Sequence, residues 1–254
     1  MADFQLEDNL IAARHVDGLL RVKEGIHGPW TAVASQVAGF QLEGNRIGAL
    51  HEDGRLRVKE GIHGPWLEVA SEVERFQLEG QRIGILQRPS HGHSESHIAV
   101  QHEDDDDDEE GNRKVRGTLS IKTSLNAPWT PVATRVAEFQ LEGSRIGILT
   151  KNRHGDDDED DDDAVGDGGS TDGLSFHSDD DDDDHDPVRR ERLTLWVKDG
   201  VDAAWSELAN HITAFQLEGN RIGMLDKKGV VRVQDGIVGT ATEIATDAVA
   251  FQLQ

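Results

Sequence analysis

A repeated stretch of about 36 residues organises the chain, and five copies of it account for most residues outside two insertions. Each copy opens with the letters FQLE, and a final FQLQ ends the chain; these motifs begin at Phe4, Phe40, Phe76, Phe139, Phe215 and Phe251. The starts lie 36, 36, 63, 76 and 36 residues apart, so the third and fourth copies carry the insertions. Repeats of this length are typical of solenoids, propellers and arrays.

The second copy indicates which local structure one repeat forms. Residues 40–43 alternate apolar and polar and then meet Gly44-Asn45, which suits the type II′ turn of a two-residue hairpin. Asp53-Gly54 marks a second turn, and the alternating runs 56–58 and 66–70 lie on either side of a break at 61–65. No part of the repeat has helical spacing. Each repeat therefore predicts four short antiparallel strands.

Four strands per repeat, five times over, predict an all-β fold: a five-bladed β-propeller of four-stranded antiparallel blades, with two long acidic loop insertions. We expect one domain over residues 1–254, with blades at about 4–39, 40–75, 76–138, 139–214 and 215–250. The alternative is a β-solenoid, which usually has shorter repeats and capped ends. Because residues 251–254 repeat the opening motif, either they or residues 4–7 are expected to fill the first strand of blade one and close the ring.

The composition narrows the class of protein. Hydrophobic residues make up 35% of the 254 residues and form no long apolar run, which predicts a soluble chain without membrane insertion. The chain has no cysteine, which excludes disulfides and thiolate metal sites but is compatible with an extracellular location. Its first residues lead directly into the first repeat, and we expect no signal peptide there.

The net charge of −24 is concentrated in the two insertions. Residues 87–117 hold nine acidic and four basic side chains, and residues 150–190 hold seventeen acidic and four basic ones. The repeats themselves are only weakly acidic, and the sequence predicts no nucleic-acid partner. Both insertions replace the Asp-Gly turn between the second and third strands. We therefore expect them to leave the same rim of the propeller from adjacent blades.

The acidic runs have two interpretations. Calcium takes about six to eight oxygen ligands, and facing loops could supply them from Asp104, Asp106, Asp108, Asp156, Asp158, Asp160, Asp180, Asp182 and Asp184. Unbroken runs, however, lack the alternation of ligands and turn glycines found in ordered calcium loops, and they are also typical of solvated, self-repelling segments. Calcium is therefore the expected cofactor only on the first interpretation. The neighbouring histidines are candidate zinc or nickel ligands without a fixed spacing.

A single tryptophan recurs after the third strand of four repeats, as Trp30, Trp66, Trp129 and Trp205, and the fifth repeat has Ala241 there. A loop such as His27-Gly28-Pro29-Trp30 can present an indole face on which the apolar face of a sugar stacks, while polar neighbours bind the hydroxyls. The candidate polar neighbours are Lys23, Lys59, Glu24, Glu60, His27, His63 and Asn126. Alternatively, the tryptophans pack neighbouring blades together. The repeated pair Glu43 and Arg46 is interpreted as a clamp across the hairpin.

These motifs carry a resemblance. The spacing W-x-x-V-A, F-x-L-E-G, R-I-G-x-L and L-x-V-K-E-G resembles the repeat of tectonin-type propeller lectins, and the five units resemble the tachylectin-type lectins. The resemblance covers the chain outside its insertions. It implies binding of glycans or cell-surface glycoconjugates at several equivalent sites near the blade junctions. Tectonin repeats usually have an aromatic residue in the second strand, where this chain has Ile47, Ile83, Ile146 and Ile222.

The sequence therefore predicts a multivalent carbohydrate-binding lectin with repeated weak sites. The alternative is a calcium- or cation-responsive adhesion or protein-interaction scaffold that acts through the Asp-rich loops. We also predict that the chain is not an enzyme. No nucleophile elbow, H-E-x-x-H motif or phosphate-binding loop is present in the sequence, and near-identical repeats favour repeated binding over a single catalytic site.

Overall fold

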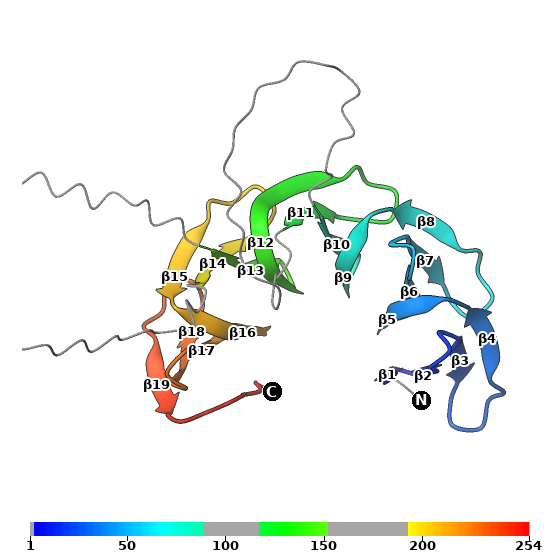
Figure 1. Cartoon of the computed structure of the whole chain (residues 1–254), viewed down its shortest axis with the longest axis horizontal. Helices are drawn as coiled ribbons and strands as arrows, with labels where there is room; N and C mark the ends of the chain where they lie inside the picture. The colour runs from blue at the N-terminus through cyan, green and yellow to red at the C-terminus, as the bar shows by residue number, and fades with distance from the viewer. Residues whose placement is uncertain (1–2, 89–116, 152–192, 254) are drawn as a thin grey trace, which may run out of the picture.

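The chain is all-β. The computed structural model describes residues 3–88, 117–151 and 193–253, and every regular element in these ranges is a strand of an antiparallel sheet. The prediction of an all-β chain made of four-stranded antiparallel sheets is confirmed. Figure 1 shows the five repeats, hereafter units 1–5, following one another along an arc, with the first strand of each unit on its inner side.

Units 1, 2 and 5 each form a separate sheet in which neighbours in the chain are neighbours in the sheet. Unit 1 contains β1 (Asp3–Glu7), β2 (Leu10–Arg14), β3 (Leu20–Glu24) and β4 (Thr31–Ala34). Unit 2 contains β5 (Val37–Glu43), β6 (Arg46–His51), β7 (Leu56–Glu60) and β8 (Leu67–Ala70). Unit 5 contains β16 (Ile212–Glu218), β17 (Arg221–Asp226), β18 (Val231–Asp235) and β19 (Thr242–Ala245).

Units 3 and 4 share one strand and therefore form a continuous seven-stranded sheet. Unit 3 contains β9 (Val73–Glu79), β10 (Arg82–Gln87) and β11 (Gly117–Lys122), and β12 (Thr130–Glu142) leads into unit 4 with β13 (Arg145–Lys151), β14 (Leu193–Asp199) and β15 (Ser206–Asn210). The first half of β12 pairs with β11 and the second half with β13. Val136 is the residue at which the partner changes, because it pairs with both Gly117 and Thr150.

The predicted hairpins are present, but the predicted clamp acts between units. Glu43 pairs with Arg46 across the two-residue turn, and Gly44 has a φ of 53°, as a type II′ turn requires. The Glu43 carboxylate, however, accepts a hydrogen bond from the Gly80 N–H at 2.8 Å, and Arg46 donates to the carbonyl oxygens of Gly80 and Gln81 in unit 3. Both side chains therefore bind the hairpin of the next unit.

The hydrophobic core lies between successive units. Ile83 and Ile85 of β10 pack with Leu56 and Val58 of β7, and each of the four side chains is almost completely buried. A glycine in the second strand allows the phenylalanine of the next unit to approach closely. A Cβ added to Gly48 would lie 2.6 Å from the ring of Phe76, and the same close approach occurs at Gly84, Gly147 and Gly223.

A glutamine on the inner strand of each unit joins that unit to the next segment of the arc. Gln41 donates from Nε2 to the Leu78 carbonyl at 2.9 Å, and its Oε1 accepts from the Leu78 N–H at 2.8 Å. The same two bonds are made by Gln5, Gln77, Gln140 and Gln216. The amide side chain thus replaces a neighbouring strand, and we call these paired bonds the carboxamide ladder.

The two ends of the chain lie on opposite sides of the opening of the arc (Figure 1). Of the two segments predicted to fill the first strand of unit 1, residues 4–7 do so, as part of β1, which pairs with β2. Residues 251–253 instead lie against unit 5, where the backbone of Leu253 binds Gln216. Leu6 of unit 1 is 62% exposed, whereas its counterparts Leu42 and Leu78, which pack against unit 1 and unit 2, are fully buried.

The described part of the chain contains no helix long and apolar enough to cross a membrane.

Candidate functional site

Each tryptophan from unit 2 onward contacts the unit that precedes it. The indole Nε1 of Trp66 donates to the Val33 carbonyl of unit 1 at 2.9 Å, and that of Trp129 donates to the Val69 carbonyl of unit 2 at 3.1 Å. Both rings are half-buried against the apolar clusters between units, as is Trp205. Trp30 of unit 1 packs on no other described unit and is 45% exposed. The indoles of units 2–4 therefore pack units together.

A lysine lies over each of these rings and also holds the following loop. The Nζ atom of Lys23, Lys59 and Lys122 is 5.1 Å from the indole centroid, and that of Lys198 is 4.7 Å away. Each ammonium donates to the carbonyl three residues ahead, at Ile26, Ile62, Leu125 or Val201. Burial lowers the pKa of Lys59, Lys122 and Lys198, and Asp202 partly opposes this effect at Lys198.

Unit 5 separates the two roles of this lysine. It has Ala241 at the tryptophan position and Gln234 at the lysine position. Gln234 is buried and donates to the carbonyl oxygens of Gly236 at 2.8 Å and Ile237 at 3.3 Å. The loop is therefore capped in the same way without an indole, which indicates that the capping bond serves the loop itself.

The remaining predicted ligand-binding residues lie at the ends of β3 and β7 or on the loops that lead to the tryptophans. Glu24, Glu60, His27, His63 and Asn126 are all exposed, and they do not line the grooves between units described below.

The predicted metal ligands lie outside the described residues. Asp104, Asp106, Asp108, Asp156, Asp158, Asp160, Asp180, Asp182 and Asp184 fall within 89–116 and 152–192. Among residues 3–88, 117–151 and 193–253, no group of three or more His, Asp or Glu side chains is arranged to hold a metal ion.

A groove of about 500 Å³ lies between units 1 and 2, and we call it the junction groove. Its lining residues are Val33, Ala34, Ser35 and Gln36 of unit 1, and His51, Glu52, Asp53, Arg57 and Trp66 of unit 2. The indole of Trp66 is fixed at one wall by its bond to Val33. The groove thus combines a fixed aromatic ring with an amide, a hydroxyl, a guanidinium and carboxylates.

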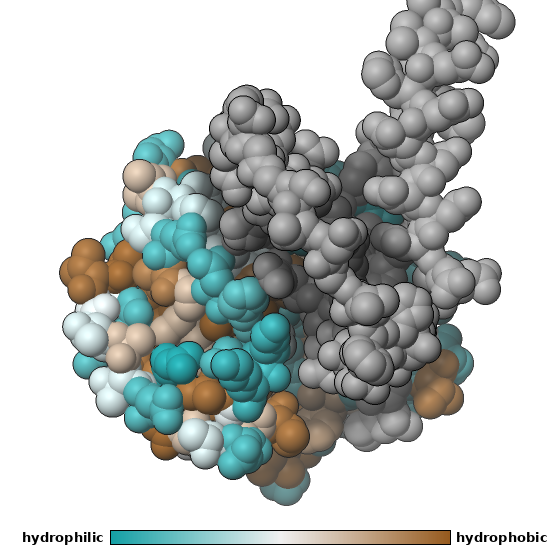
Figure 2. Space-filling view, turned by 60° about the vertical axis from the view of Figure 1, so that its left-hand side comes forward, coloured by the Kyte–Doolittle hydropathy of each residue, from teal (hydrophilic) through white to brown (hydrophobic). Residues whose placement is uncertain are grey.

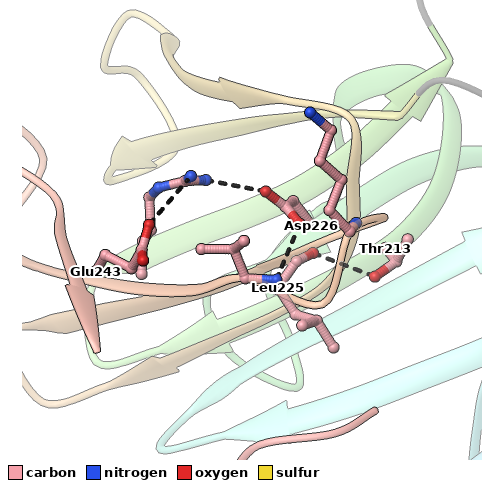
Figure 3. Close-up of polar contacts among 7 residues, drawn as sticks. Thr213, Leu225, Asp226 and Glu243 are labelled. Carbon is pink, nitrogen blue, oxygen red and sulfur yellow. Dashed lines mark hydrogen bonds and ion pairs between the residues drawn. The ribbon is translucent and has the colours of Figure 1, made fainter. Parts of the chain in front are cut away.

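Arg57 is held toward the groove wall by an ion pair that recurs in unit 5. Its guanidinium lies 3.7 Å from the carboxylate of Glu68 on the next strand. The equivalent Arg232 lies 3.7 Å from Glu243 and 3.1 Å from Asp226. Figure 3 labels these two acidic residues and marks their ion pairs by dashed lines. All these groups are partly exposed, so the pairs contribute little to stability, typically about 0–1 kcal/mol each. Their effect is to orient the arginine.

Several of these residues were not predicted. Gln36, Glu52 and Asp53 lie between strands, His51 ends β6, and Arg57 lies in the run 56–58 that was predicted as a strand. None of the five was predicted to bind a ligand. The glutamines of the carboxamide ladder were also not predicted, although the sequence contains a signal for them. FQL is repeated without change in all six copies, and a polar residue that only faces solvent would not need to be glutamine in every copy. No comparable signal marks the groove residues, because they differ between units.

No protein-family model matches the chain, and no curated protein sequence matches it. Solved structures with a similar fold include Pyrococcus horikoshii acylaminoacyl peptidase without ligand, with a TM-score of 0.58 and 9% identity over 95% of this chain and 38% of that chain. An acylaminoacyl peptidase in complex with Z-Gly-Gly-Phe-chloromethyl ketone also has a TM-score of 0.58, with 10% identity over 96% of this chain and 39% of that chain. At such identities the likeness shows a shared fold, and this chain spans well under half of those proteins.

The comparison corrects the prediction that the chain is not an enzyme. That prediction relied on the similarity of the repeats, yet structures of the same fold include a peptidase. The fold is therefore related to that of enzymes, and repetition alone does not exclude catalysis.

Replacement of Trp66 by alanine tests the packing role of the indole. Loss of a buried tryptophan costs about 3–5 kcal/mol, and because Trp66 is half-buried we expect Trp66→Ala to lower the free energy of unfolding by about 2–3 kcal/mol in urea denaturation. His63→Ala, a change on the exposed loop of the same unit, is the control and should stay within about 0.5 kcal/mol. Unchanged stability of Trp66→Ala would contradict the packing role and favour a ligand platform.

Proposed function

We propose that the chain is a five-bladed β-propeller that binds carbohydrate at the junctions between its blades. The observation that carries the binding proposal is the junction groove between units 1 and 2. A volume of about 500 Å³ lies within the range of about 300–1,000 Å³ that is common for small-molecule sites. The resemblance of the repeats to tectonin-type and tachylectin-type lectins supports the same ligand class.

The chemistry of the lining favours a sugar. Saccharides present a hydrophobic face of C–H groups and a rim of hydroxyls, which need an aromatic ring beside several hydrogen-bonding groups. Trp66 supplies the ring, and Arg57, Glu52, Asp53 and Gln36 supply donors and acceptors. Because Trp66 is already ordered by its contacts with unit 1, binding would cost little further side-chain entropy.

Repetition supports several sites of this kind. The junctions of units 2 with 3 and of units 3 with 4 also hold an indole, Trp129 and Trp205, and Trp196 packs in the same cluster as Trp205. The neighbouring polar residues differ between junctions, so individual affinities should differ. Attachment of a multivalent glycan to several weak sites raises the overall affinity by about 10²–10⁴ without any new contact.

Closure of the arc into a propeller is supported by hydrophobic side chains that are exposed at its two ends but packed between units elsewhere. Trp30 of unit 1 is exposed, although its counterparts pack on the outer strand of the preceding unit. Ile244 of unit 5 occupies the position equivalent to Val33 and is 59% exposed. Figure 2 shows hydrophobic residues interspersed with hydrophilic ones over the described part of the face it presents. Contact between units 5 and 1 would bury Trp30 against Ile244 as a fifth junction.

Arg57→Ala is the test of the binding proposal, with a glycan array to identify a ligand and isothermal calorimetry to measure its affinity. Loss of a charged hydrogen-bonding group should weaken binding about tenfold or more, equivalent to about 1.4 kcal/mol. Arg21→Ala is the matched control, because Arg21 is the equivalent residue of unit 1 and does not line the groove. Equal losses for both variants, or no glycan bound by the unaltered chain, would refute the proposal.

Trp30→Ala is the test of closure. In a closed ring Trp30 is packed like Trp66, so its replacement should lower the free energy of unfolding by a similar amount, about 2–3 kcal/mol. An arc that stays open predicts a change within about 0.5 kcal/mol, because the exposed indole then loses few contacts. Urea denaturation of the two alanine variants side by side separates these outcomes.

A further inference from the structure

A second groove lies between units 2 and 3, on the other side of the turn that follows β6. It has a volume of about 520 Å³, and we call it the acidic groove. Its lining residues are Ala38, Leu50, His51, Glu52, Asp53 and Gly54 of unit 2 with Glu72, Val73, Glu74 and Arg88 beside unit 3. Four carboxylates therefore face one arginine and one histidine, and the lining is net negative.

Two groups in this groove have unused hydrogen-bonding capacity. The Nε2 atom of His51 and the Oε2 atom of Glu74 are shielded from solvent and have no hydrogen-bond partner among the residues that the structure describes. A buried polar atom without a partner costs about 1–3 kcal/mol. His51 and Glu74 come from different units and both line this groove, which makes them the first candidates to bind a ligand there.

The equivalent residues of other units show that the fold does not itself leave these groups unpaired. Gln87, which occupies the His51 position in unit 3, donates to the Ser71 carbonyl at 2.9 Å. Asp226, at that position in unit 5, accepts from the N–H groups of Lys228 at 2.8 Å and Val230 at 3.0 Å (Figure 3). Burial acts to raise the pKa of Asp226, but these bonds and Arg232 outweigh it, and the pKa lies below its ordinary value.

The Glu74 position gives the same contrast. Units 2 and 4 have Ala38 and Ala137 there, and unit 5 has Thr213, whose hydroxyl donates to the Leu225 carbonyl at 3.2 Å (Figure 3). Alanine and threonine are thus compatible with the fold at this point. The carboxylate of Glu74 is therefore not needed for the strand, and Glu74 lines a groove that three other acidic residues also line.

The ligand that fits this lining is a cation rich in hydrogen-bond donors. Carboxylates only accept hydrogen bonds, whereas an ammonium group carries three donors and a positive charge. A metal ion is disfavoured, because in the described ranges no three His, Asp or Glu side chains converge as metal ligands. We propose that the acidic groove binds a primary ammonium group, carried by an amino sugar or by a free amine, with Glu74 and His51 as its main partners.

This site goes beyond the proposed function, because it binds a positively charged group that a neutral glycan lacks. The probes are glucosamine, glucose and ethylamine, titrated into the full chain at neutral pH with calorimetric detection. Glucosamine should bind at least tenfold more tightly than glucose. Ethylamine that binds as well as glucosamine would support a site for amines in general, and weaker binding of ethylamine would support an amino-sugar site. Equal binding of glucosamine and glucose would overturn the proposal.

Glu74→Gln keeps the shape of the side chain and removes its charge, so it should weaken glucosamine binding at least tenfold. The control is Glu207→Gln, which removes the same charge from β15, outside both grooves, and should leave binding unchanged. If Glu74→Gln unfolds, Glu74→Ala replaces it, since alanine occupies this position in units 2 and 4. Unchanged binding in the Glu74 variants, or an equal loss in Glu207→Gln, would refute the site.

The two proposals fail independently. Arg57 lines the junction groove but not the acidic groove, and Glu74 lines the acidic groove but not the junction groove. Arg57→Ala should therefore weaken the neutral glycan and spare glucosamine at the acidic groove, whereas Glu74→Gln should have the reverse effect.

Discussion

The carboxamide ladder is the interaction on which the arrangement of the units depends. An isolated four-stranded sheet of this size buries little, and its inner strand would leave one edge of backbone groups unpaired. The glutamine of the preceding unit satisfies the leucine N–H and carbonyl of that edge, and it does so at each of five successive positions. The same register brings phenylalanine onto glycine and tryptophan onto the preceding outer strand. Stability then builds up from contacts between neighbours, as in other repeat proteins.

This dependence on neighbours explains where binding sites arise. The apolar residues and most invariant polar residues of the repeat are used to join units, which leaves the turn after the second strand and the outer edge of the third strand free to vary. Both grooves include the turn after the second strand, because His51, Glu52 and Asp53 line both of them. Residues beside the start of the next first strand, such as Gln36 and Glu74, contribute to the lining as well. The residues that join the units are therefore constant, and the residues that line the grooves can differ from junction to junction. The peptidase structures of similar fold show that this fold also occurs in enzymes.

Local patterns were sufficient to predict the strands, and contacts between units were not predictable from them. Alternation and turn glycines gave the hairpins around Gly44 and Gly54 correctly. The role of Gln41 was missed because a polar residue in an alternating strand looks the same whether it faces solvent or a neighbouring backbone. The Glu43–Arg46 pair was predicted to act only across its own turn. Its bonds to the next hairpin were missed because that hairpin lies 36 residues further along the chain. His51 and Glu74 could not be singled out, since their lack of partners is visible only in three dimensions.

The most direct test of the ladder is amide hydrogen exchange measured residue by residue by NMR. In the ladder, a leucine N–H donates to a glutamine side chain of the preceding unit and has no neighbouring strand on that side. The leucines are Leu42, Leu78, Leu141 and Leu217. We expect these four amides to exchange as slowly as the central strand amides of β6, and Gln77→Ala to accelerate Leu141 while leaving Leu42 slow. Exchange of all four at the rate of exposed loop amides, or no selective effect on Leu141, would contradict the account.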